Sequence, residues 1–197
     1  MRKAFKIAVA VIITIIVLAV AFVGVAFLDL AAYTATGSQN LTPTGTSLGK
    51  AIVVYDPGLS SAAKGVADKV ASDLQSSGYT VTLAGIKSPA AANASNYAVI
   101  VVGGPVYGGS LTSSVRDFLK GLKPYQSSLP EGTLIFNKVG IFGSGGGSTT
   151  PKDVTILRNS VSALSNNGTL SQAIVVKIGQ SENLNARAAD FTSQLTS

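Results

Sequence analysis

The chain has 197 residues and a formal net charge of +6, and it contains neither cysteine nor histidine. Without these residue types it has no thiolate nucleophile, no usual general base near neutral pH and no soft metal ligand. From Lys50 onward its Lys and Arg residues are scattered singly, without a basic stripe and interleaved aromatic residues, so the sequence argues against nucleic-acid binding.

The N-terminal part of the chain predicts a membrane anchor. A basic tail, residues 1–6, precedes an uncharged apolar segment, residues 7–28. A helix of this length extends about 33 Å, which is enough to cross the hydrocarbon layer. We therefore predict a transmembrane signal anchor at 7–28. A cleaved signal peptide, with a small-residue site at Ala35–Gly37, is the alternative, but apolar cores of signal peptides usually run only about 7–15 residues.

The distribution of positive charge predicts the orientation of this anchor. Arg2, Lys3 and Lys6 precede the apolar segment, whereas residues 29–49 contain no Lys or Arg. The positive-inside rule then places the N-terminus in the cytoplasm and the rest of the chain outside it. Residues 29–49 are mostly polar towards their C-terminal end and predict a flexible tether. Residues 50–197 remain, a length that suits one domain.

This domain alternates between short apolar runs and helical periodicity. Five β-branched runs predict strands buried on both faces, at 51–55, 79–85, 97–104, 138–143 and 173–179. Helical stripes lie at 61–77 and 111–122, and two more contain Val154 to Leu164 and Leu184 to Leu195. Between the second and third strands there is room only for a short or irregular helix. The order predicts an α/β fold in three layers, with a parallel five-stranded sheet and right-handed crossovers.

Three glycine-containing loops follow strands of this sheet, at 56–64, 103–110 and 143–150. Ligands of open α/β sheets bind outside the C-terminal ends of the strands. Glycine lets backbone N–H groups approach a ligand closely. The loops therefore predict a slot for a planar, anionic ligand at this edge of the sheet.

From Lys50 to the end, the chain resembles flavodoxins and flavodoxin-like domains. The resemblance rests on "AIVVYDPGLSSAAKGVADKVASDL", on "YAVIVVGGPVYGGSLTSSVRDFL" with its Gly-x-Pro-x-aromatic-Gly element, and on "KVGIFGSGGGS". It implies a flavodoxin-like α/β/α sandwich with strand order 2-1-3-4-5, and FMN as the cofactor. The FMN phosphate would lie on the first loop, and the isoalloxazine ring between the second and third.

The resemblance assigns the phosphate to residues of the first loop. These are Gly58, Ser60, Ser61 and Lys64. The two serines would hydrogen-bond the phosphate beside the positive end of the following helix. Alternatively, one of them only caps that helix. The loop departs from the family pattern, because Asp56 would repel a phosphate that it faced, and Ala62 and Ala63 stand where polar side chains are expected.

The resemblance assigns the ring to the other two loops. Tyr107 would stack on the flavin and exclude water, or else it only covers the sheet edge. Gly108 would let a peptide turn its carbonyl towards the flavin N5 on reduction. The remaining residues expected at the ring are Pro105, Val106, Gly143, Ser144, Gly145 and Gly146.

Together these features predict a membrane-tethered, FMN-binding electron carrier with an unidentified redox partner protein. The flavin does the chemistry, so no catalytic side chain and no metal ligand are assigned. A flavodoxin fold that has lost FMN and serves as a binding or structural module is the first alternative. An NAD(P)H-dependent flavin or quinone reductase is the second, although no nicotinamide site is recognisable. The sequence contains no nucleophile elbow, the motif that would indicate a serine hydrolase.

Overall fold

The computed structural model describes residues 11–21, 35–58, 60, 62–122, 138–164, 170 and 172–197. The chain divides into two compact units, 1–34 and 35–197. In the first unit, residues 11–21 form a helix whose side chains are exposed. Within the described ranges, no helix has the length and apolar character needed to cross a membrane. The remainder of the predicted anchor, 7–10 and 22–28, lies outside the described residues.

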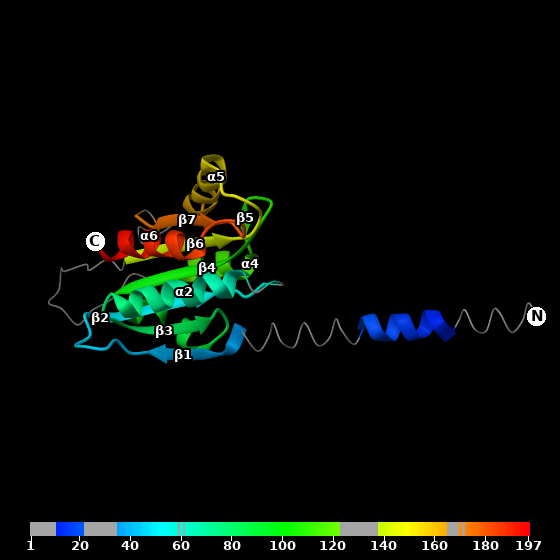
Figure 1. Cartoon of the computed structure of the whole chain (residues 1–197), viewed down its shortest axis with the longest axis horizontal. Coiled ribbons are helices and arrows are strands. Elements are labelled where there is room, and N and C mark those ends of the chain that lie inside the picture. The colour runs from blue at the N-terminus through cyan, green and yellow to red at the C-terminus, as the bar shows by residue number, and fades with distance from the viewer. Residues whose placement is uncertain are drawn as a thin grey trace, which may run out of the picture. The chain divides into compact units, whose positions relative to one another are not determined.

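The second unit is built on a mainly parallel sheet (Figure 1). Five parallel strands lie in the order β3-β2-β4-β6-β7, which is the predicted order 2-1-3-4-5. Their bounds are β2 Gly49–Tyr55, β3 Tyr79–Gly85, β4 Val99–Tyr107, β6 Lys138–Ser144 and β7 Ile174–Ile178. Two short antiparallel strands were not predicted: β1 Ser38–Leu41, which pairs with β3, and β5 Ser110–Leu111, which pairs with β4.

Both additions correct the sequence-based assignment. The expected tether, residues 29–49, contains β1, whose main chain pairs with the outer edge of β3 and whose Asn40 side chain accepts a hydrogen bond from Thr82 Oγ1 at 2.9 Å. A polar, exposed edge strand has no apolar run by which to recognise it. Residues 105–107, expected in a loop, extend β4 beyond the predicted strand 97–104, because β6 pairs with this strand as far as Pro105 and β5 pairs with its end.

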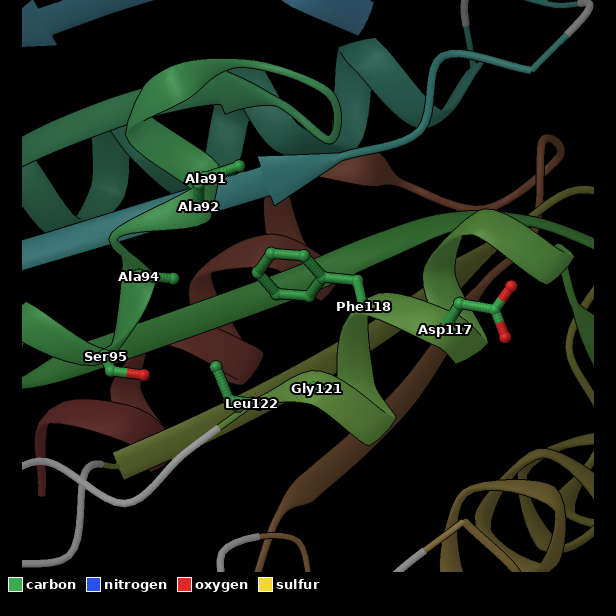
Figure 2. A pocket seen from close by; sticks show the side chains of 8 residues that line it. All are labelled: Ala91, Ala92, Ala94, Ser95, Asp117, Phe118, Gly121 and Leu122. Carbon is green, nitrogen blue, oxygen red and sulfur yellow. The ribbon is translucent and has the colours of Figure 1, made fainter.

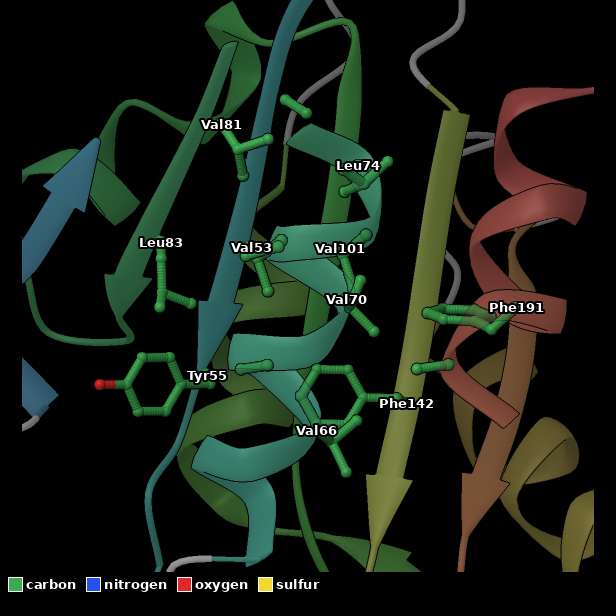
Figure 3. Close-up of a cluster of buried hydrophobic side chains, with 14 of the residues drawn as sticks. Val53, Tyr55, Val66, Val70, Leu74, Val81, Leu83, Val101, Phe142 and Phe191 are labelled. Carbon is green, nitrogen blue, oxygen red and sulfur yellow. The ribbon is translucent and has the colours of Figure 1, made fainter. Parts of the chain in front are cut away.

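Helices cover both faces of the sheet. The described helical elements are α2 Ala62–Ser76, α3 Pro89–Ala92, the 3₁₀ helix η1 Ala94–Asn96, α4 Ser113–Gly121, α5 Pro151–Ser162 and α6 Leu184–Thr196. One apolar cluster joins the sheet to α2 and α6, and Figure 3 shows Val66, Val70 and Leu74 of α2 together with Phe191 of α6 in this cluster. A second cluster joins the other face to α3, α4 and α5. The central strands are apolar throughout because both of their faces are covered.

Candidate functional site

Strands β2, β4, β6 and β7 end at one edge of the sheet, and a cavity of about 300 Å³ lies there between the segments that follow β2, β6 and β7. The cavity lies beside the first turn of α2. Two predicted site residues from different loops, Ser60 and Ser144, line it together. The other lining residues are Ala62, Gly65, Val66, Ile178, Gly179, Gln180, Glu182 and Leu184. The structure therefore brings the first and third predicted loops to one site.

Ser144 is the last residue of β6 and is 2% exposed. Its hydroxyl has no hydrogen-bond partner among the residues that the structure describes. A buried hydroxyl without a partner is uncommon, because its desolvation is not compensated. Since Ser144 lines the cavity, its hydroxyl is suited to bind a polar group of a ligand placed there.

The first loop is tied to the start of α4 by Asp56. The Gly58 N–H donates to Asp56 Oδ1 at 3.1 Å, and Thr112 Oγ1 donates to Asp56 Oδ2 at 2.7 Å. Gly58 has a φ of +59° and lies against the ring of Pro105, where a Cβ would overlap that ring. The Asp56 carboxylate therefore binds the backbone N–H of Gly58, a residue that the resemblance assigns to the phosphate.

Lys64 does not contribute an unpaired charge to this site. Its Nζ lies 2.8 Å from Asp68 Oδ2, and this hydrogen bond raises the pKa of Lys64 above its ordinary value. Lys64 is absent from the described lining of the cavity, whereas Ala62, at the start of α2, is part of it. Ser61 lies outside the described residues. Because Ala62 lines the cavity, the first turn of α2 borders it, and this turn is the positive end of the helix dipole.

Tyr107 lies at the tip of a β-hairpin. It ends β4 and pairs with Ser110 of β5 across a turn in which Gly108 and Gly109 have φ values of +57° and +84°. Its side chain is 57% exposed, so the ring is not folded into the interior. A Cβ on Gly109 would lie 2.7 Å from Ile156 Cγ2 of α5, whereas one on Gly108 would meet nothing within 4 Å. The hairpin therefore rests on α5 and presents an aromatic ring to solvent.

The second and third loops are in contact at the ends of their strands. Val106 packs against Gly143 so closely that a Cβ there would overlap the valine side chain. Gly145 and Gly146 have φ values of +122° and +74°, which favour glycine. The Gly145 N–H donates to the Ile178 carbonyl at 3.3 Å, and the Gly146 carbonyl accepts from the Gln180 N–H at 3.1 Å. The third loop is thus bound to the turn after β7 rather than standing free.

Glu182 holds these two segments together. Its carboxylate accepts hydrogen bonds from the Gly179 N–H at 2.7 Å, from Thr149 Oγ1 at 2.8 Å and from the Thr149 N–H at 3.3 Å, and it lies 3.8 Å from Arg187 Nε. Burial alone would raise the pKa of Glu182, but these hydrogen bonds and the Arg187 charge lower it below its ordinary value. Glu182 therefore stays ionised while it bridges the two loops.

Sequence reasoning missed the loop that follows β7, which supplies Gly179, Gln180 and Glu182 to the cavity. The predicted topology could have indicated this loop, because the fifth predicted strand ends at the same edge of the sheet as the others. Its loop lacks the glycine cluster that marked the second and third loops, so only topology could have identified it.

A second cavity, of about 190 Å³, lies between α3, η1 and α4 (Figure 2). In this view Phe118 points towards the alanines of α3 and η1, and Asp117 points away from them. The described lining is small and mostly apolar, with Asp117 as its one charged residue. None of the predicted site residues lies there.

The fold is similar to that of solved flavodoxins, although no protein-family model and no curated protein matches the sequence. The flavodoxin of Streptococcus pneumoniae TIGR4 is 18% identical with a TM-score of 0.51, over 75% of this chain and 97% of that one. A short-chain flavodoxin associated with a non-canonical PDU bacterial microcompartment is 22% identical with a TM-score of 0.51, over 75% and 96%.

Some of the matching proteins are much larger than this chain. Rubredoxin oxygen:oxidoreductase of Desulfovibrio gigas is 18% identical with a TM-score of 0.47, over 79% of this chain and 37% of that one. The chain spans 36% of a flavodiiron core from Synechocystis and thus little more than a third of either protein. The two full-length flavodoxin matches and the strand order lead to one conclusion: residues 35–197 have the flavodoxin-like fold.

Proposed function

We propose that the domain binds FMN at the C-terminal edge of its sheet and carries electrons. One observation carries this proposal: Ser60 and Ser144, from separate loops, line a single cavity at the start of α2, and the buried Ser144 hydroxyl has no partner among the described residues. An anion at this position gains from the helix dipole and from hydroxyl donors. The fold supports the proposal, because FMN is the cofactor that the resemblance to flavodoxins implies.

In this proposal, different residues would bind the two ends of the cofactor. Ser60, Ser144 and the first turn of α2 would hold the phosphate or ribityl end. Tyr107, exposed on a fixed hairpin, would cover one face of the ring and exclude water from it. A Cβ on Gly108 would meet nothing within 4 Å, and glycine at this position would allow its peptide to turn a carbonyl towards the ring. Bound flavin supplies one- and two-electron transfer, and the protein supplies position and electrostatics.

A cofactor-free binding or structural module is the second candidate. The Gly58 N–H is already bonded to Asp56, and Lys64 is paired with Asp68. Ala62 and Ala63 bring no hydroxyl to the start of α2. These contacts reduce the number of groups on the first loop that are available to a phosphate, and they favour this candidate over a reductase.

FMN titration of the full-length chain separates the two candidates. Binding should quench flavin fluorescence and raise the melting temperature, because a ligand at about 100 times its Kd stabilises the folded state by about 2.7 kcal/mol. The absence of both signals would rule out the FMN proposal and leave the cofactor-free module.

The role of Ser144 can be tested with a matched pair of variants. Ser144→Ala should weaken FMN binding by about 1–3 kcal/mol, since a hydrogen bond to a charged group is lost. It should not destabilise the free protein, because the hydroxyl has no partner there to lose. Thr192→Val is the control, since Thr192 also has a buried hydroxyl without a described partner but does not line the cavity. Equal FMN affinity in all three proteins would remove Ser144 from the site.

We also propose that residues 7–28 attach the chain to a membrane and that the domain lies outside the cytoplasm, where it meets its redox partner. The support is the uncharged apolar segment and the positive charge that precedes it.

A further inference from the structure

The two edges of the sheet differ in chemistry. At one edge, β1 covers β3 with the polar, largely exposed sequence Ser-Gln-Asn-Leu. At the other edge lies β7, with the sequence Ile-Val-Val-Lys-Ile, which among the described residues pairs only with β6. Proteins usually blunt an exposed edge strand with charge, proline or a cover, because its unpaired main chain is a template for another strand.

A groove of about 370 Å³ runs along this outer edge. Ile174, Val175 and Val176 of β7 contribute to it, as do Val154 of α5 and Phe191 of α6. Arg187, Asp190, Ser193 and Gln194 of α6 complete the lining, so the groove has apolar contacts at Val154 and Phe191 and polar groups along the rest of α6. Helices on opposite faces of the sheet line one groove, so β7 lies between two walls (Figure 1).

The main chain of β7 points polar groups into this groove. The Gly145 N–H donates to the Ile178 carbonyl, so Ile178 faces β6. Because residues alternate along a strand, the N–H and C=O groups of Val175 and Lys177 face outward. The Lys177 carbonyl accepts from Arg187 Nη2 at 3.1 Å and from Thr149 Oγ1 at 3.3 Å. The N–H and carbonyl of Val175 and the N–H of Lys177 have no such partner within the described part of the chain.

A side chain in the groove also lacks a hydrogen-bond partner. Arg187 Nε is buried and donates to no acceptor among the described residues, although Glu182 lies 3.8 Å away. Arg187 lines the groove and already holds the adjacent Lys177 carbonyl. Arg187 Nε itself is buried and acts on the Glu182 carboxylate through its charge, so the main-chain groups of β7 are the ones open to an added strand.

We propose that the outer edge of β7 binds an extended segment of a partner polypeptide as an added strand. An extended main chain provides N–H and C=O groups at the two-residue spacing of the Val175 and Lys177 groups, and its alternate apolar side chains suit the groove. A second copy of this chain is the less suitable occupant, because its own β7 is also flanked by α5 and α6. The partner segment is therefore a single extended strand, whose apolar side chains would meet Val154 and Phe191.

Amide exchange in the full-length, isotope-labelled chain tests the first requirement. In the free protein, the Val175 and Lys177 amides should exchange at least about tenfold faster than the Val176 and Ile178 amides, which face β6. Slow exchange of Val175 in the free monomer would mean that the chain covers its own edge, and the proposal would be wrong. Sedimentation should show a monomer; a dimer with a protected Val175 amide would assign the edge to a second copy instead.

A synthetic peptide with the sequence of residues 173–179 is a suitable strand probe, because that sequence already forms a paired strand in this protein. Its addition should slow exchange of the Val175 and Lys177 amides by about tenfold or more. The same peptide with alternate N-methyl groups, which cannot donate along one edge, should give no protection. Failure of the unmethylated peptide to protect either amide at millimolar concentration would overturn the proposal.

Two variants locate the peptide. Val154→Lys places a charge in the groove wall and should weaken peptide binding by about tenfold or more, whereas Thr155→Lys, on the exposed side of the same helix, should not. Melting temperatures of both variants show whether they remain folded. Val176→Lys tests the strand itself if Val154→Lys does not fold. Equal peptide affinity in wild type and the folded groove variant would show that the peptide binds elsewhere.

Discussion

At the scale of single residues, Gly179 shows how a segment distant in sequence restricts which residue type a position can hold. The Gly147 carbonyl passes so close to Gly179 that a Cβ there would overlap it. A Cβ on Gly147 itself would meet no atom within 4 Å. The need for glycine at position 179 therefore arises from the packing of the third loop against the turn after β7.

Gly179→Ala should lower the free energy of unfolding by about 1–3 kcal/mol, because a backbone segment must move to admit the methyl group. Gly147→Ala is the matched control and should change stability by less than about 1 kcal/mol. Urea denaturation of both variants measures the difference. Similar stabilities for the two would mean that the loops do not cross as described.

Tyr107 is the residue on which ring binding depends in the proposed function. Tyr107→Ala should weaken FMN binding by about 1–2 kcal/mol through loss of stacking, and Tyr107→Phe should retain most of the affinity. Because the side chain is 57% exposed, neither change should alter the melting temperature of the free protein by much. Unchanged FMN affinity in Tyr107→Ala would show that the ring only covers the sheet edge.

At the scale of elements, the contact between the third loop and the turn after β7 depends on the ionised Glu182. The folded-state pKa of Glu182 is lowered from 4.5, so its contribution to stability is present above that value and is lost as pH falls through the folded pKa. The stability difference between wild type and Glu182→Gln should therefore shrink between about pH 6 and pH 3. Urea denaturation across that range measures it. A difference that does not vary with pH would mean that Glu182 ionisation does not hold the loops.

The start of α5 depends on a reciprocal cap. Thr150 Oγ1 accepts from the Asp153 N–H at 3.2 Å, and Asp153 Oδ2 accepts from the Thr150 N–H at 2.9 Å. The Thr150 N–H, first, and then the Thr150 hydroxyl, which donates to Asp153 Oδ2 at 2.9 Å, lower the pKa of the Asp153 carboxyl. Thr150→Ala should cost about 1 kcal/mol in unfolding free energy, and Thr150→Ser should restore most of it. An equal loss in both variants would contradict the cap.

At the scale of the whole molecule, the proposed location can be tested on intact cells. Protease added outside the cells should digest the domain, and carbonate extraction should leave the chain with the membrane fraction, if residues 7–28 anchor it. A cytoplasmic protein of known location serves as the control for cell integrity. Protection of the domain while that control also survives would reverse the proposed orientation.

The sequence pattern alone indicated the layered α/β architecture and its five parallel strands, whereas their order was implied by the resemblance to flavodoxins. Runs such as Ile52 to Val54 and Val99 to Val102 are apolar on both faces, so only a sheet covered by helices on both sides can bury them. It also indicated the loops at the ligand edge, because they follow the C-terminal ends of buried strands. The resemblance then assigned Ser60 and Ser144 within those loops, and both line one cavity.

Only the tertiary structure decided which groups within those loops are available. Asp56 takes the Gly58 N–H, Glu182 binds Thr149, and β1 pairs with β3 through main-chain groups that carry no side-chain signal. Some of these contacts join residues that are distant in sequence, and the others depend on the direction in which the backbone N–H and C=O groups point. A periodic pattern records how a segment is buried, but hydrogen-bond partners are chosen by the positions of atoms after the chain has folded.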